Sequence, residues 1–418
     1  MKTTYLISGI FIGVAMLTHP LEAQNQAAPA AFETPAVLSA ESLLKPEFVR
    51  GPYHQILDPV PTAGFSNQYT VRTKWGTHTI RGNDLLAKRL KELNAIAELE
   101  QTSKSDEFEK ALRTAAAKPF HMVGNTLQDP VGTAKNLGSG AMRFIKRAGE
   151  VATRSGKRSA NTDNAAEALI GFSKQKREIA YQLGVDPYSH NQILQQHLDD
   201  MAWASFGGGF VIRLGTFAVG GAVGGLVGGL STADDIAKAI RDNTPSDLSA
   251  MNREILSGMG ISEATIKAFL EHSAISPTNQ TVITAKLHNL GQAGGREDFL
   301  KMVLACQDST DVLFFQRIIL MMVAYHTEVS PVKQVLNLNG LPVIHAANEA
   351  LVVPLSVDYG WWSAEAERLS AAIANFKPAY NISERSLYIS GTVSPLAKAQ
   401  LRKRGFVVSE NTSASFYR

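Results

Sequence analysis

The sequence predicts an α+β protein, in which a mainly helical domain with a glycine-laddered helix is followed by a small C-terminal α/β module. Three observations support this prediction. Apolar residues recur at helical spacing through most of residues 83–329. The uncharged run 214–230 repeats glycine every four residues. After residue 330, short apolar runs alternate with turn signals, as expected of strands interspersed with helices.

Composition sets broad limits on the protein. With 418 residues, of which 44% are hydrophobic, the chain is long enough for two or three domains with substantial cores. The net charge of +3 gives no general argument for nucleic acid, so no nucleic-acid partner is expected. Cys306 is the only cysteine and lies in a helical apolar pattern. This context indicates a buried thiol and excludes an internal disulfide framework.

The N-terminus has the three-part layout of a secretory signal peptide over residues 1–23. Lys2 provides the positive region, residues 5–17 are mostly apolar, and Ala23 offers the cleavage position. The alternative is an N-terminal membrane anchor, for which the apolar run is short. We therefore expect an exported protein, periplasmic or associated with the cell envelope. Residues 24–48 are rich in alanine and proline, which predicts a flexible tether with little structure.

Residues 49–82 are predicted to be a β-hairpin region. Within it, residues 67–81 alternate in polarity around Trp75-Gly76, a hairpin signal. The helical domain, residues 83–329, then starts with Asn83-Asp84 as the expected N-cap of a first helix. A second helix is expected from Asp106 to Ala117 and a loop at 159–165.

A basic segment follows within the helical domain. In residues 129–158, small side chains form a narrow helical seam, and seven basic residues accompany one acid between 135 and 158. One interpretation is an amphipathic helix lying on an anionic membrane surface. The other is a solvated basic face on a helix whose small seam packs inside the protein. The predicted basic surface contains Lys135, Arg143, Lys146, Arg147 and Arg154.

The glycine ladder predicts close helix packing, in protein or in lipid. Four residues make about one helical turn, so the glycines would form two adjacent smooth stripes. Such a face allows another backbone to approach closely. A helix over this run would be about 26 Å long, slightly short of a bilayer core of about 30 Å. The glycines of the two stripes are Gly220, Gly224 and Gly228, and Gly221, Gly225 and Gly229.

The remaining chain is predicted to fold as a helical core followed by the C-terminal module. Residues 311–326 are apolar nearly all round and are the expected central helix. In the module, residues 330–418, Asn339-Gly340 predicts a hairpin and Pro354 favours an edge or an irregular place for its strand. Ser363 and Ser394-Pro395 are expected to start the two helices. The order is β-β-β-α-β-α-β, with a parallel crossover over 387–408.

No motif in the sequence carries an assignable chemistry. Phosphate-loop, dinucleotide, metalloprotease and nucleophile-elbow patterns do not occur, so catalytic residues are unknown and neither cofactor nor metal is predicted. The turn 391–394 between a strand and a helix is the best site-like position, because backbone N–H groups there could hold an anion. The alternative is an ordinary turn between a strand and a helix. His326 and His345 flank the expected domain junction, and His197-Leu198-Asp199-Asp200 places two acids after a histidine.

The stretch KQKREIAYQLGVDPYSHNQILQQHLDDMAWASFGGG, residues 174–209, resembles a segment of an uncharacterised family of exported bacterial proteins. The likeness extends over FLEHSAISPTNQT at 269–281 and SLYISGTVSP at 386–395. The resemblance implies a bacterial envelope setting. It brings no activity and therefore no catalytic residues.

The function expected from these observations is that of a non-enzymatic cell-envelope protein that associates with a membrane or a protein partner. The ladder and the basic segment motivate this hypothesis. The first alternative is an exported hydrolase with its site at the junction of the helical domain and the C-terminal module, because clefts between domains are common sites. The second is a membrane-inserting or pore-forming protein that uses residues 207–230.

Overall fold

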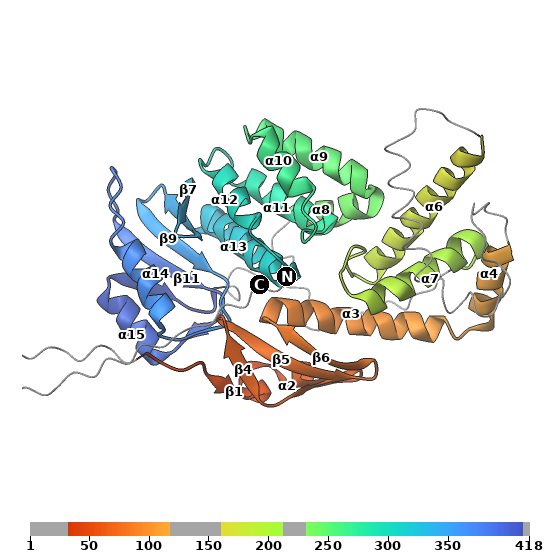
Figure 1. Cartoon of the computed structure of the whole chain (residues 1–418), viewed down its shortest axis with the longest axis horizontal. Coiled ribbons are helices and arrows are strands. Elements are labelled where there is room, and N and C mark those ends of the chain that lie inside the picture. Colours follow the sequence, from red (N-terminus) through yellow and green to blue (C-terminus); the bar gives the residue numbers. More distant parts are fainter. Residues whose placement is uncertain (1–31, 118–159, 212–230, 413–418) are drawn as a thin grey trace, which may run out of the picture.

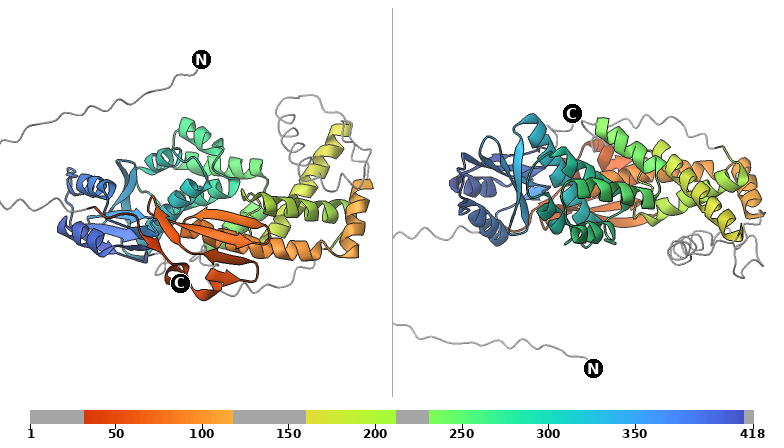
Figure 2. Two further views of the ribbon diagram at one scale, coloured as in Figure 1. Left: turned by 60° about the horizontal axis from the view of Figure 1, so that its bottom comes forward. Right: turned by 90° about the horizontal axis from the view of Figure 1, so that it is seen from above.

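The computed structural model describes residues 32–117, 160–211 and 231–412. In this part of the chain the protein is α+β, with a sheet at the N-terminal side, a run of helices, and a second sheet at the C-terminal side (Figure 1). The C-terminal sheet and the helices α4, α6 and α7 lie at opposite ends of the elongated molecule (Figure 2).

The N-terminal sheet is built around the long strand β5. The strands β1, β4, β5, β3 and β2 follow one another in that order, and β6 pairs with β5 on its other side. The hairpin predicted around Trp75-Gly76 is confirmed, because Thr73 faces Gly76 at the β5–β6 turn. The elements of this part are β1 Val37–Leu38, α1 Ala40–Leu43, α2 Pro46–Val49, β2 Arg50–Gly51, β3 His54–Leu57, β4 Val60–Ala63, β5 Ser66–Thr73 and β6 Gly76–Arg81.

The prediction of an unstructured tether is wrong for residues 37–48. Val37 and Leu38 pair with β4 as a strand, and Ala40 is buried against the sheet. The Ala40 N–H donates to Asp58 at 2.7 Å. Backbone pairing with β4 outweighs the Ala/Pro-rich composition from which disorder was predicted, because composition reports nothing about a distant strand.

Ten helices are described between the two sheets. They are α3 Asn83–Thr102, α4 Asp106–Ala117, α6 Ala160–Gln182, α7 Gln192–Gly208, α8 Ser231–Asp242, α9 Pro245–Gly258, α10 Glu263–Leu270, α11 Pro277–Asn289, α12 Arg296–Val303 and α13 Ser309–Glu328. The predicted helix at 106–117 is confirmed as α4, and the predicted core helix at 311–326 as α13. The predicted loop at 159–165 is wrong from Ala160 onward, because α6 already begins there.

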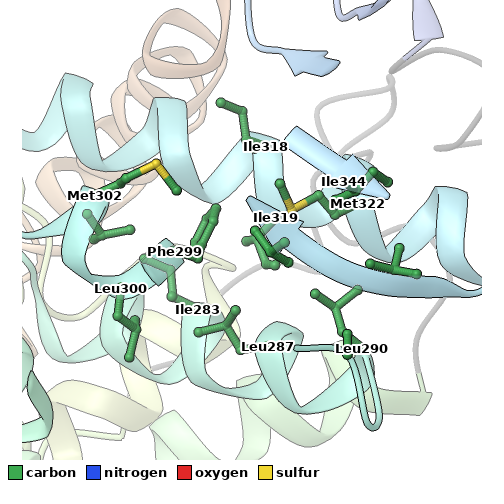
Figure 3. Close-up of a cluster of buried hydrophobic side chains, with 14 of the residues drawn as sticks. Ile283, Leu287, Leu290, Phe299, Leu300, Met302, Ile318, Ile319, Met322 and Ile344 are labelled. Atoms are coloured by element: carbon green, nitrogen blue, oxygen red, sulfur yellow. The ribbon is translucent and has the colours of Figure 1, made fainter. Parts of the chain in front are cut away.

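Two hydrophobic cores join these helices to one another, and a further one packs α3 on the N-terminal sheet. One joins α3, α4, α6 and α7, with Leu99, Phe172 and Leu198 among its fully buried side chains. The other joins α9–α13 to one face of the C-terminal sheet (Figure 3). There Leu287 of α11, Phe299 of α12 and Ile319 of α13 meet beneath the sheet residue Ile344.

The C-terminal sheet has the strand order β13-β11-β9-β8-β7. Strands β9, β11 and β13 are parallel, and β7, β8 and β9 are joined as antiparallel neighbours. Its second face packs on α14 and α15, with Trp362 fully buried between. The elements are β7 Val332–Leu338, β8 Leu341–Ala346, β9 Ala350–Leu355, β10 Tyr359–Gly360, α14 Ala364–Ala374, β11 Glu384–Ile389, β12 Thr392–Val393, α15 Pro395–Lys403 and β13 Phe406–Ser409.

Of the two alternatives predicted from Pro354, the edge position is wrong, because β9 is the middle strand of five, and the irregular place agrees with the structure. Pro354 is tolerated there for a local reason. On the β8 side, pairing ends where Ile344 faces Val352, so no β8 residue is paired with Pro354. A proline lacks the N–H that continued pairing would require.

Candidate functional site

The residues singled out from the sequence as a packing or membrane face lie outside the described residues. This holds for Gly220, Gly221, Gly224, Gly225, Gly228 and Gly229, and equally for Lys135, Arg143, Lys146, Arg147 and Arg154. Among the described residues, no helix combines the length and the apolar character that crossing a membrane requires. The structure does describe the ends of the two helices, α4 and α7, that precede the basic segment and the glycine ladder.

Those ends meet through small residues. Gly207 and Gly208 close α7, and they pack on Ala111 and Ala115 of α4. A Cβ on Gly208 would lie 2.1 Å from the Ala111 carbonyl oxygen, and one on Gly207 would lie 2.6 Å from the Ala115 Cβ. Close approach of two backbones through glycine and alanine is the packing mode that the sequence predicted for the glycines farther along.

The junction of the two sheets holds a cluster of polar side chains. Asp358, just after β9, points to the start of α3 and to β5. Its Oδ2 accepts the Asn67 N–H at 2.9 Å and the Asn83 N–H at 3.2 Å. The structure thus places the N-cap of α3 at Gly82, and the capping carboxylate comes from Asp358, 276 positions away along the chain. The predicted cap at Asn83-Asp84 is corrected accordingly.

A buried ion pair lies beside Asp358. Arg317 of α13 is 9% exposed, and its Nε donates to Asp84 Oδ2 at 3.0 Å. Arg81 pairs more loosely with Asp308 at 3.6 Å and with Asp311 at 3.4 Å. Both arginines therefore tie the end of the N-terminal sheet and the start of α3 to α13.

Burial decides the charge state of Asp358. Desolvation raises the pKa of Asp358 to about 7, opposed by the N–H groups of Asn67 and Asn83. The Asp84 carboxylate raises it further by repulsion, and Arg317 lowers it. A carboxyl that titrates near neutrality is a common property of functional sites, although structural clusters show it too.

The pocket at this junction is too small for an organic substrate. Its volume of about 30 Å³ holds one or two water molecules. Asp84, Asp358 and Arg81 line it together with Thr310 and Phe314. Asp358 was not singled out from the sequence. The available signal was its place at the carboxyl end of a strand, where α/β sheets gather functional groups.

The turn 391–394 already holds carboxylates from this chain. Glu33 accepts the Trp362 N–H at 2.6 Å and the Ser394 hydroxyl at 2.5 Å through the same oxygen. Glu410 accepts the Val393 N–H at 2.8 Å and pairs with Lys398. Apart from the Val393 N–H, the backbone N–H groups of the turn donate to backbone carbonyl oxygens of residues 357–360. The expected arrangement, in which these N–H groups are available to an anion, is therefore not present.

The two junction histidines serve local contacts. Nδ1 of His326 accepts the Val332 N–H at 3.0 Å. His345 contacts Glu349 at 2.8 Å and stacks on Tyr380 with ring centroids 4.0 Å apart. These contacts and the turn 391–394 form separate places in the fold. The hydrolase alternative called for a pocket that gathers His326, His345 or the turn 391–394 with carboxylates. The junction pocket described above is lined by neither histidine and by no residue of this turn.

The other side chains considered in the sequence analysis make local contacts or are buried. His197 lies 3.9 Å from Glu100, and Asp199 pairs with Lys176 at 2.5 Å. Cys306 is buried, and burial raises the pKa of its thiol to about 12. Within residues 32–117, 160–211 and 231–412, no group of three or more His, Cys, Asp or Glu side chains is placed to hold a metal ion.

Comparison of the chain with protein-family models, curated protein sequences and solved structures gave no match.

Proposed function

We propose that the protein is an exported, non-enzymatic component of the bacterial cell envelope that associates with a membrane surface or an envelope protein. The described domains serve as a scaffold, and the contact is made by the basic segment and the glycine ladder. The export part of the proposal rests on the predicted signal peptide over residues 1–23 and on the resemblance to exported bacterial proteins. A pore-forming role for 207–230 remains the alternative within the same setting.

The single observation that carries the proposal is the position of the two helix ends after which the basic segment and the ladder begin. The chain leaves α4 after Ala117 for the basic segment and leaves α7 near Gly209 for the ladder. Contacts of Gly207 with Ala115 and of Gly171 in α6 with Phe206 bring the helices together near these exits. The group α4, α6 and α7 forms the end of the molecule opposite the C-terminal sheet (Figure 1). Both segments therefore start from one end of the scaffold.

A second consideration is how the polar sites of the scaffold are used. Glu33 accepts the Ser394 hydroxyl, Arg317 is bound to Asp84, and the junction pocket holds only water-sized molecules. These groups stabilise contacts between parts of the chain. A scaffold whose polar clusters serve its own assembly supports a binding role better than catalysis.

The test begins with expression of the full chain in a bacterial host, separation of periplasm from membranes, and an alkaline carbonate wash. The mature protein is then sedimented with vesicles of neutral or anionic lipid. We expect retention on anionic vesicles and loss of retention when the five basic-surface residues are changed to glutamine. The matched control changes five exposed lysines of the scaffold to glutamine, namely Lys45, Lys104, Lys110, Lys267 and Lys377.

Equal binding by the two five-residue variants would overturn the assignment to the basic segment. A mature chain that ignores both vesicle types and runs as a monomer without a co-purifying envelope protein would overturn the proposal itself. Release of an entrapped dye from the vesicles would favour the pore-forming alternative. Replacement of Gly224 and Gly225 by leucine should then block release, since bulky side chains prevent close helix packing.

A further inference from the structure

We propose that the joint between the two sheets is a pH-responsive contact, in which Asp358 holds β5 and the start of α3 more firmly in mildly acidic than in alkaline solution. The inference concerns the described scaffold and does not depend on export or on membrane binding. It rests first on the geometry of the joint.

Asp358 has an asymmetric set of partners. Both backbone N–H groups point to Oδ2, whereas Oδ1 has only the Asn83 N–H at 3.3 Å. A protonated carboxyl can therefore keep its two main acceptor contacts through Oδ2 and carry the proton on Oδ1. Ionisation leaves a negative charge in the wall of a pocket that admits one or two waters.

No cation pairs with Asp358 among the described residues. Arg317, whose charge favours ionisation of Asp358, is engaged with Asp84, whose own negative charge disfavours it. The Asn67 and Asn83 N–H groups favour the carboxylate, whereas Asp84, a second acid in the first turn of α3, disfavours it. Desolvation and repulsion together outweigh them, which agrees with the raised pKa of Asp358.

The acidic side chains around Asp358 are held in ion pairs. Asp84, Asp308 and Asp311 are each ion-paired with an arginine, and arginine keeps its charge in proteins. Burial raises the pKa of Tyr69 on β5 and that of Tyr359 on β10 above the usual tyrosine value. The charged and titratable groups facing the joint are Asp84 on α3, Arg317 and Asp311 on α13, Asp308 before α13, Arg81 on β6, and the two tyrosines.

The direction of the effect follows from proton linkage. The folded pKa is about 7, against about 3.8 for an unperturbed aspartate. Between these values the folded state binds more protons than the unfolded state, so stability falls as pH rises and levels off above the folded pKa. One such group changes the unfolding equilibrium by up to about tenfold per pH unit in this window.

The experiment measures urea unfolding and hydrogen exchange of the full chain from about pH 5 to about pH 8. Asp358→Asn fixes the side chain in a neutral state. We expect the wild type to lose stability relative to this variant by up to about tenfold per pH unit from pH 5 to 7. In the wild type, exchange of the Asn67 and Asn83 amides, corrected for intrinsic rates, should become faster as pH rises.

Asp200→Asn is the matched control. Burial and the neighbouring Asp199 raise the pKa of Asp200 to about 6, but this residue lies on α7, away from the joint. Its replacement should alter the pH dependence of global stability while leaving exchange at Asn67 and Asn83 unchanged.

Parallel pH dependence in wild type and Asp358→Asn would overturn the proposal. So would stability of the wild type that rises relative to the variant with increasing pH, because Asp358 would then be held as a carboxylate. If Asp358→Asn fails to fold, wild-type exchange decides: corrected rates at Asn67 and Asn83 that stay constant from pH 5 to 8 rule the contact out.

Discussion

Arg317 of α13 binds Asp84 in the first turn of α3, and the two residues are 233 positions apart in the sequence. The Arg317 side chain is 10% exposed and the Asp84 side chain 22%, so the pair is largely shielded from water. The pair lies where α3 starts after the N-terminal sheet, and it fixes that sheet against the helical core beneath the C-terminal sheet.

Removal of one partner should be costly because the other charge remains buried. We expect Arg317→Ala to lower the free energy of unfolding by about 2–4 kcal/mol. Urea denaturation at neutral pH measures the change. Arg81→Ala is the comparison: its longer and more exposed contacts with Asp308 and Asp311 should contribute about 0–1 kcal/mol. Equal losses for the two variants would show that shielding at Arg317 has no energetic role.

The crossing of α4 and α7 should tolerate no side chain at Gly208. A Cβ there would meet the Ala111 backbone at 2.1 Å, so Gly208→Ala must separate the helices, and we expect a loss of about 1–3 kcal/mol. Thermal unfolding compares it with Gly258→Ala in α9, where a Cβ meets nothing within 4 Å. The second variant should be neutral or slightly stabilised, by up to about 1 kcal/mol. A stable Gly208→Ala protein would contradict the close contact.

Glu297 should make part of the stability dependent on pH. Hydrogen bonds from Ser262 and then Thr265 lower its pKa to about 2. Because the folded pKa is below the unfolded one, the contribution is complete above about pH 4.5 and is lost as pH falls toward 2. Glu297→Gln should therefore be less stable than wild type near neutrality, with the gap closing in acid. Glu254→Gln, an exposed control, should show no closing gap in urea titrations.

Cys306 should be chemically silent in the folded protein. Its raised pKa leaves very little thiolate at neutral pH, and its side chain is 5% exposed. We expect reaction with a disulfide reagent to be at least about a hundredfold slower than in urea-unfolded protein. Reaction of the native protein at the unfolded rate would mean that the helix end around Cys306 opens freely.

Local signals predicted local structure. Trp75-Gly76 predicted a hairpin, Ser363 and Ser394 predicted helix starts, and Asn339-Gly340 predicted the β7–β8 turn, all of which are present. These features depend on side chains within a few residues of the backbone groups that they satisfy. The sequence pattern is then sufficient.

Contacts between distant residues were not predictable in the same way. Val37-Leu38 forms a strand because β4 is available, and Pro354 occupies a central strand because β8 stops pairing before it. Asp358 caps a helix that starts 275 positions earlier. Each depends on which segments meet in the folded chain, and neither periodicity nor composition reports that. The candidate site at the junction was missed for this reason.

The Glu33 contact also sets an order of events during synthesis. Glu33 emerges from the ribosome among the early residues, yet its partners Trp362 and Ser394 lie 329 and 361 positions later. Its carboxylate stays in contact with water until the C-terminal sheet and α15 have been synthesised. Closure of this contact is thus among the final steps of assembly, and a chain truncated before Trp362 would lack both partners of Glu33.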